Sequence, residues 1–278
     1  MNRKSVEERA KIIQLLVEGN SVRSTSRIAD CSINTVMKLQ HEIGIFCEGY
    51  QMLALQELNC KFIEVDEIWS FVYARKGTET EQECAGDLWT FSCICPDTKL
   101  VPCWYIGERT KQSAIEFLTD LKSRLSGRVQ ISTDGFPAYK DAVEQVFGKD
   151  VDLGRLMKQY SEKKGNQVRG KYQGAHKDKS IGCPDEARIT TAHIERQNLN
   201  MRNSISRFRR KTSAFSKKAE SHCDAVALHF MYHNFCRIHT SLRVTPAMEA
   251  GIEDHVWSIE EMLEMCDEMN ILEEMEEL

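Results

Sequence analysis

The stretch KFIEVDEIWSFVYAR, residues 61–75, constrains the fold more than any other part of the chain. Its β-branched and aromatic residues favour a β-strand. Val65 and Ile68 flank Asp66 and indicate that the strand is buried in a sheet, where an unpaired carboxylate is costly. The chain is therefore expected to fold around a sheet that carries an acid in its interior, and that acid requires a partner.

The elements predicted after this strand alternate between strands and helices. They are strands at 88–94, 99–107 and 128–133, helices near 111–125 and from Pro137, helices again at 191–209 and 219–238, and an irregular basic region at 160–188. The order βββαβα with trailing helices predicts an α/β fold, with a mixed sheet covered by helices.

Residues 5–46 instead follow a helical period and predict three short helices. Ser5, Ser21 and Ser32 are the expected N-caps, and Gly44 is the expected end of the third helix. Two short helices joined by a tight turn are typical of a helix-turn-helix, whose later helix enters the major groove of DNA.

In that interpretation Asn34, Thr35 and Lys38 face DNA. The alternative is a plain helical bundle, because residues 1–50 hold only seven Lys and Arg against six Asp and Glu. The sequence alone leaves both interpretations of this all-α segment open.

The charges of the chain are strongly segregated. Residues 154–218 hold 17 Lys and Arg against 5 Asp and Glu, whereas residues 253–278 hold 11 acids and no Lys or Arg. A basic middle implies a polyanionic partner. The run RFRRK is predicted to contact phosphates, with a solvated helix end as the alternative; its basic residues are Arg207, Arg209, Arg210 and Lys211.

No run approaches the ~20 apolar residues that span a bilayer, and the N-terminus has no apolar signal-peptide core. The eleven scattered cysteines include no CxxC and are expected to be reduced thiols. These features predict a cytoplasmic, nucleoid-associated protein with no membrane partner.

Three acids occupy positions at which α/β folds commonly carry functional side chains. Asp66 lies within the first strand, Asp134 follows the strand at 128–133, and Glu195 begins a helix. Glu64 and Glu67 compete with Asp66 as ligands, and the period of two puts Glu64 on the face of Asp66 and Glu67 on the opposite face. Converging carboxylates suit magnesium, and two such ions can promote phosphoryl transfer.

Four stretches together resemble a known family: VDEIWSF, STDGFPAYKDAV, HIERQNLNMRNSISRFRRKTSAFSKK and YHNFCRIHTSLRVTPAMEAG. They are similar to the DDE transposases of insertion sequences, specifically the insertion-sequence-one group. The resemblance implies an RNase H-like fold and an enzyme that cuts DNA at element ends and joins 3′ ends to a target. It also implies two Mg²⁺ ions, for which Mn²⁺ can substitute.

By this resemblance Asp66, Asp134 and Glu195 are the catalytic, metal-binding triad. Arg202, seven residues after Glu195, would hold a substrate phosphate, and Asn198 is a weaker candidate for DNA contact. The expected domains are a helix-turn-helix domain at 1–50, an RNase H-like catalytic domain at 58–250 and an acidic amphipathic helix at 251–278.

The partners implied are double-stranded DNA, both element ends and target, and further copies of the chain in a homo-oligomer. A nuclease that cuts without joining is one alternative. The other is a non-catalytic DNA-binding regulator or inactive remnant of a transposase.

Overall fold

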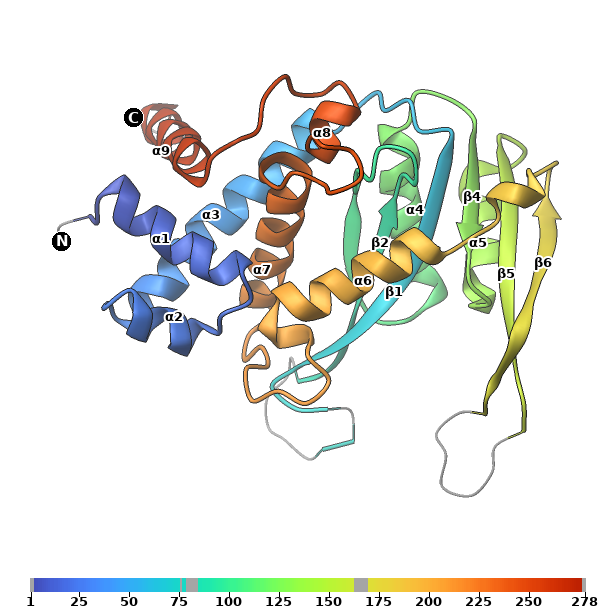
Figure 1. The fold of residues 1–278 in the computed structure, drawn as a ribbon, viewed down its shortest axis with the longest axis horizontal. Coiled ribbons are helices and arrows are strands. Elements are labelled where there is room, and N and C mark those ends of the chain that lie inside the picture. Colours follow the sequence, from blue (N-terminus) through green and yellow to red (C-terminus); the bar gives the residue numbers. More distant parts are fainter. Residues whose placement is uncertain (1–2, 76, 79–84, 163–169, 277–278) are drawn as a thin grey trace. The chain divides into compact units, whose positions relative to one another are not determined.

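The computed structural model describes residues 3–75, 77–78, 85–162 and 170–276 (Figure 1). The chain forms two compact units, and neither is a continuous stretch of sequence. The first unit consists of Met1–Leu55, Trp69–Leu88 and Asn198–Leu278, and the second of Gln56–Ile68 and Trp89–Gln197. The sequential domain boundaries expected from the sequence stay a prediction.

Six strands form one mixed sheet in the order β3-β2-β1-β4-β5-β6. The strands are β1 (Phe62–Val72), β2 (Gly86–Ile94), β3 (Trp104–Gly107), β4 (Val129–Thr133), β5 (Val151–Tyr160) and β6 (Tyr172–Ile181). β4 runs parallel to both β1 and β5, while β2 with β3 and β5 with β6 are antiparallel. The predicted mixed α/β sheet is confirmed.

The sheet differs from the prediction at its edges. β3 begins only at Trp104, β5 was not predicted, and β6 lies inside the region expected to be irregular, of which residues 163–169 are outside the described ranges. β6 pairs on one side only and carries polar residues on both faces. It therefore lacks the alternation by which a half-buried strand is recognised.

Two helices of the second unit pack against each other beside the sheet. They are α4 (Lys111–Arg124), which Thr110 caps, and α5 (Pro137–Phe147), which Pro137 begins. The helix predicted near 111–125 is confirmed, and its face formed by Ala114, Phe117 and Leu121 is fully buried. α6 (Ala192–Ser204) follows a short 3₁₀ turn at Glu186–Arg188.

The first unit is helical apart from the far ends of β1 and β2. Its helices are α1 (Val6–Val17), α2 (Val22–Ile28), α3 (Ile33–Ala54), α7 (Ala219–Met231), which continues as a π-helical turn at Tyr232–Cys236, α8 (Pro246–Glu249) and α9 (Ile259–Glu276). The predicted N-caps Ser5, Ser21 and Ser32 are confirmed, and Ser5 forms a capping box with Glu8. Among the described residues, no helix is long and apolar enough to cross a membrane.

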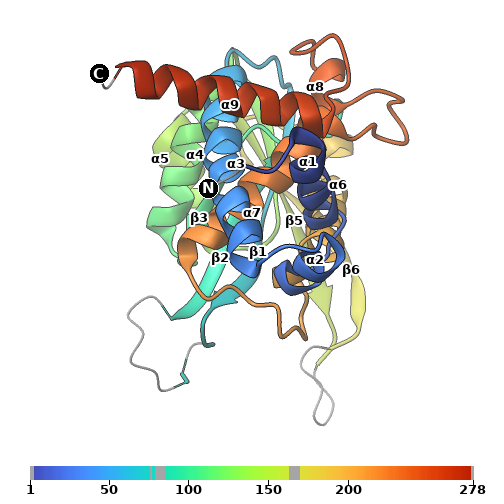
Figure 2. The same cartoon turned by 90° about the vertical axis from the view of Figure 1, so that its left-hand side faces the viewer.

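The acidic helix α9 packs across α1 and α3 (Figure 2). A capping box begins α9: Ser258 Oγ accepts from the Glu261 amide at 3.0 Å, and Glu261 Oε2 accepts from the Ser258 amide at 3.3 Å. Asp267 binds Arg9 through two hydrogen bonds of 2.8 and 2.6 Å, and Arg3 adds a third contact of 2.6 Å. The tail is thus attached to the first helix through specific ion pairs.

The predicted end of α3 at Gly44 is wrong, because the helix continues to Ala54. Gly44 is buried where α7 crosses α3, and a Cβ there would lie 2.6 Å from the Asp224 Cβ. This glycine serves close approach of two helices, so its signal was misread as a helix stop.

We expect Gly44→Ala to lower the free energy of unfolding by roughly 1–3 kcal/mol, because the added methyl group overlaps Asp224. Gly49→Ala on the same helix is the matched control. No atom lies within 4 Å of its Cβ position, so higher helix propensity should stabilise it by about 0.5–1 kcal/mol. Urea unfolding of both variants checks this, and equal effects would contradict the role given to Gly44.

Candidate active site

The pairing of β1 with β4 places Asp66 and Asp134 side by side. The two strands are parallel, with Phe62 opposite Gln130 and Glu64 opposite Ser132. Extending this register by two residues brings Asp66 level with Asp134, which follows the last residue of β4. Carboxyl ends of adjacent parallel strands are a common position for functional groups in α/β sheets.

A third carboxylate, that of Glu67, joins the two aspartates. One oxygen from each of Asp66, Glu67 and Asp134 lies within 4.8 Å of the others. The period of two had placed Glu67 on the opposite face of β1, and the sequence therefore did not predict this grouping. The adjacent acids Asp66-Glu67 are the sequence signal that could have indicated it.

Arg109 fixes Glu67 in this cluster. Its Nε and Nη2 donate to Glu67 Oε1 at 2.8 and 2.5 Å. The guanidinium also lies 3.9 Å from the ring centre of Phe136 and 5.0 Å from that of Trp89. Glu67 Oε2 is buried and makes no well-aligned hydrogen bond within the described part of the chain, although the nearby Tyr139 hydroxyl acts to lower the pKa of Glu67.

The cluster carries more negative charge than its surroundings neutralise. Burial, followed by the charges of Glu67 and Asp134, raises the pKa of Asp66 to about 7, and the charge of Glu195 adds to the shift. Burial and Asp134 also raise the pKa of Glu67, although Arg109 opposes this. Burial and the same carboxylates raise the pKa of the Tyr139 hydroxyl well above its usual value.

The donor set fits hard divalent cations. All three groups are carboxylates, one buried oxygen makes no well-aligned hydrogen bond within the described residues, and one carboxyl is driven towards protonation by its neighbours. A bound cation would relieve each of these costs, and Mg²⁺ or Mn²⁺ prefers such oxygen ligands.

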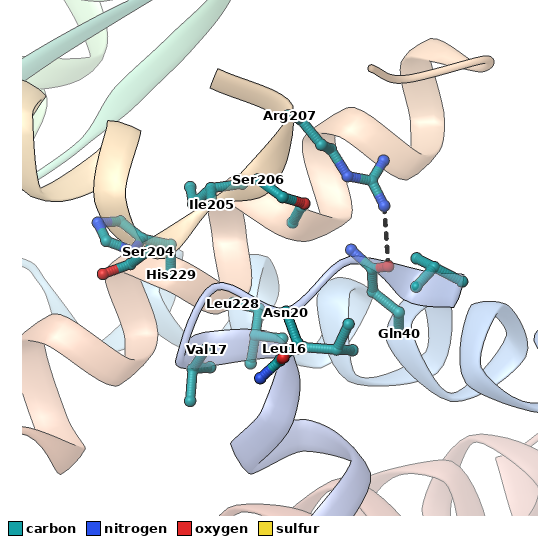
Figure 3. A pocket seen from close by; sticks show the side chains of 12 residues that line it. Leu16, Val17, Asn20, Gln40, Ser204, Ile205, Ser206, Arg207, Leu228 and His229 are labelled. Atoms are coloured by element: carbon teal, nitrogen blue, oxygen red, sulfur yellow. Dashed lines mark hydrogen bonds between the residues drawn. The ribbon is translucent and has the colours of Figure 1, made fainter. Parts of the chain in front are cut away.

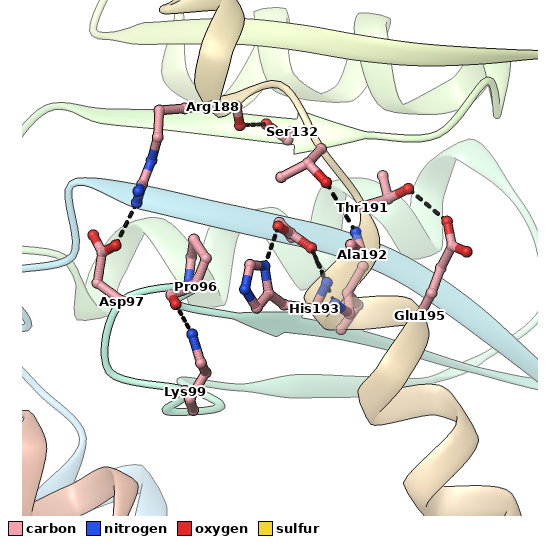
Figure 4. A network of polar contacts seen from close by, with 12 residues as sticks. Pro96, Asp97, Lys99, Ser132, Arg188, Thr191, Ala192, His193 and Glu195 are labelled. Atoms are coloured by element: carbon pink, nitrogen blue, oxygen red, sulfur yellow. Dashed lines mark hydrogen bonds and ion pairs between the residues drawn. The ribbon is translucent and has the colours of Figure 1, made fainter. Parts of the chain in front are cut away.

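Glu64 holds the start of α6 and thereby positions Glu195. Its side chain is only 1% exposed, and its Oε2 accepts from the amides of His193 and Ile194 at 2.8 and 3.0 Å. Its Oε1 lies 2.7 Å from His193 Nδ1, a contact drawn beside the labelled His193 in Figure 4. A carboxylate at a helix N-terminus satisfies free amides and complements the helix dipole.

Two residues of β4 hold the segment that leads into α6. The side chain of Gln130 binds the backbone of Asp185 through hydrogen bonds of 3.0 and 2.7 Å. Ser132 Oγ donates to the Arg188 carbonyl at 3.2 Å (Figure 4). Gln130 and Ser132 precede Asp134 with the period of a strand, and the same face of β4 therefore carries both the acid and these anchors.

Glu195 lies near the cluster but binds other groups. Its Oε1 accepts from Thr191 Oγ1 at 2.6 Å (Figure 4) and from Lys158 Nζ of β5. Burial raises the pKa of Glu195, but the hydrogen bonds from Lys158 and Thr191 outweigh it and bring the pKa below the usual value. Asp66 and Asp134 thus lie together, and the charge of Glu195 contributes to the raised pKa of Asp66.

Arg207 lies inside the first unit, in contrast to the expected position facing DNA. Its guanidinium donates to the Ser221 carbonyl at 2.5 Å and to Gln40 Oε1 at 2.9 Å, in a pocket lined also by Leu16 and His229 (Figure 3). Burial lowers the pKa of Arg207 to about 10. These contacts assign it a structural position.

The other predicted DNA contacts are distributed between surface and interior. Arg209, Arg210 and Lys211 are exposed, as are Asn34 and Lys38 on α3, whereas Asn198 is only 8% exposed. Thr35 takes part in capping its own helix, 2.8 Å from Ser32 Oγ. Arg202 lies on α6 and donates to the Phe208 carbonyl at 3.1 Å. Their contacts with DNA stay a prediction.

Residues 170–236 match a family model described as IS1 transposase. The resemblance to the IS1 transposases is confirmed. The matched segment contains Glu195 and Arg202, while Asp66 and Asp134 precede it. No curated protein matches the chain.

Solved structures similar to this chain include complexes of two transposases. The Mos1 strand transfer complex is 14% identical with a TM-score of 0.25, covering 55% of this chain and 59% of the Mos1 chain. A piggyBac synaptic complex with hairpin DNA is 10% identical with a TM-score of 0.39, covering 95% and 71%. Likenesses of this size establish no shared function.

We expect Glu64→Ala to release the start of α6, because the His193 and Ile194 amides lose a buried charged acceptor. Hydrogen exchange at these two amides should accelerate at least about tenfold, with a stability loss of roughly 1.5–3 kcal/mol. Glu64→Gln keeps an oxygen acceptor and should lie between wild type and Glu64→Ala. Unchanged protection in Glu64→Ala would show that α6 is held by other contacts.

Proposed function

We propose that the chain is a metal-dependent DDE transposase, which cleaves DNA at insertion-sequence ends and transfers the strands to a target. The observation that carries this proposal is that Asp66, within β1, and Asp134, directly after the parallel strand β4, lie together, with the charge of Glu195 acting on Asp66. The match of residues 170–236 to the IS1 transposases supports it.

In this proposal Asp66, Asp134 and Glu195 hold two Mg²⁺ ions, and Glu67 lies within reach as a further carboxylate. Such ions activate an attacking oxygen and stabilise the leaving one in phosphoryl transfer. The chain itself supplies the position of the ligands. Glu64 fixes the start of α6, and Arg109, whose guanidinium lies against the rings of Phe136 and Trp89, fixes Glu67.

The expected substrate is double-stranded DNA. α2 and α3 would act as a helix-turn-helix, with the exposed Asn34 and Lys38 towards the groove. Arg209, Arg210 and Lys211 offer exposed cations for phosphates, and Phe215 anchors their segment by stacking on Phe71 at 5.1 Å.

The proposal extends to fold and assembly. A mixed sheet in the order β3-β2-β1-β4-β5-β6, covered by helices, is compatible with an RNase H-like catalytic domain. A transposase must also bring two element ends together, which implies a homo-oligomer. Both follow from the resemblance and are part of this proposal.

Two alternatives predict different products. A nuclease of the same fold would nick DNA without joining it, and a regulator or inactive remnant would bind DNA without cutting. The incompletely neutralised carboxylate cluster favours a catalytic role, because a purely structural site gains nothing from a buried carboxylate oxygen without a well-aligned hydrogen bond. An assay on a duplex that carries an element end, resolving nicked from joined products, separates all three.

We expect Asp66→Asn, Asp134→Asn and Glu195→Gln each to lower the cleavage rate in Mg²⁺ by more than about 100-fold, since each removes a charged ligand. Chelation of the metal should have the same effect on wild type. Asp141→Asn, an exposed acid of α5 paired with Lys111, is the control and should leave the rate unchanged. Full activity in the Asp66 and Glu195 variants would overturn the triad.

The basic residues after α6 should divide into two classes. Arg210→Ala and Lys211→Ala remove exposed cations, so each should weaken DNA binding and reduce the slope of log affinity against log salt by about 1. Arg207→Gln removes partly buried hydrogen bonds, so it should lower the free energy of unfolding by roughly 1–3 kcal/mol and leave the slope unchanged. A lower salt slope in Arg207→Gln would place that cation on DNA.

A further inference from the structure

Lys158 is a cation placed at the third acid of the candidate site. Its Nζ donates to Glu195 Oε1, in an ion pair whose lysine is 30% and whose glutamate is 43% exposed. Burial lowers the pKa of Lys158, but Glu195 outweighs this effect, and Asp66 also contributes to the raised pKa. The ammonium therefore lies in the field of two of the three acids proposed as metal ligands.

The sheet determines this position of Lys158. β5 runs parallel to β4 with Arg155 opposite Thr133, so the chain reaches Lys158 beyond the level of Asp134. Met157, the residue before it, lies beside Gly135, the residue after Asp134. Lys158 is thus held at the carboxyl end of the same parallel strands that present the two aspartates.

Lys158 and a divalent ion would compete for the one negative charge of Glu195. Lys158 and Thr191 both donate to Oε1 of this carboxylate, the latter at 2.6 Å. A divalent ion bound to the same carboxylate would lie close to the ammonium and be repelled by it.

The formal charges of the site also indicate that Lys158 takes the place of a divalent ion. When all four are ionised, as they must be to bind metal, Asp66, Glu67, Asp134 and Glu195 carry four negative charges, and the two cations bound to them, Arg109 and Lys158, leave a formal excess of two. One divalent ion neutralises that excess. Withdrawal of Lys158 makes the excess three, and the arrival of one DNA phosphate makes it four, which two divalent ions neutralise.

We infer that Lys158 is a resident counterion that neutralises Glu195 in place of a second divalent ion and withdraws when that ion binds. This inference rests on the proposed metal site. Lys158 acts through Glu195 and is a positioning residue. In the absence of DNA it leaves the site with a negative charge that a single divalent ion neutralises.

Titration of the full chain with Mn²⁺ in the absence of DNA tests the inference, by calorimetry or by the spin-resonance signal of free Mn²⁺. Lys158→Met should bind the second ion on the order of tenfold more tightly than wild type, because the competing ammonium is gone. Lys158→Arg keeps the charge and should behave as wild type. Lys177→Met removes the same charge from β6, where its Nζ binds the Glu186 carbonyl, and should change the affinity less than about twofold.

A double-mutant cycle separates competition from a general loss of positive charge. In the Glu195→Gln background, Lys158→Met should no longer tighten binding of the second ion. Equal tightening with and without Glu195, or no tightening at all, overturns the inference. Asp66→Asn identifies a different failure: if it binds Mn²⁺ as wild type does, the proposed metal site is wrong. If only Asp66→Asn weakens binding, the site stands without a role for Lys158.

Discussion

The position of Glu195 depends on a contact made by another acid, Glu64. Glu64 satisfies two free amides at the start of α6 from within β1, two residues before Asp66. Gln130 and Ser132 hold the preceding segment from β4 in the same way, ahead of Asp134. Each strand therefore presents one acid to the site and anchors the chain that delivers the third. The geometry of the site is a property of two adjacent strands.

The sequence predicted features that are set locally and missed those set by distant partners. The strand around Asp66, the serine caps and the helix near 111–125 follow from neighbouring residues, and all are found. The meeting of Asp66 with Asp134 depends on strand register, which only the resemblance implied. Glu67 joins them because Arg109, from a distant segment, holds it there. The periodicity of apolar residues along the sequence does not reveal such a contact between distant segments.

The remaining differences have physical causes of the same kind. β6 is an edge strand and shows no apolar alternation, while Gly44 accommodates Asp224 of α7 in place of ending its helix. Arg207 belongs to a basic run, yet Gln40 and Ser221 enclose its guanidinium. The composition of the run predicted phosphate contact for all of its cations, whereas the structure shows one that is largely enclosed and three that are exposed.

The contact between Arg9 and Asp267 has a consequence for how the chain acquires its structure. α1 is synthesised early and α9 late, yet the two pack together and share this ion pair. Segments that fold during synthesis do so from the N-terminal side. The apolar side of α1 that α9 covers therefore stays exposed during synthesis. The first unit can complete its packing only after α9 has been synthesised.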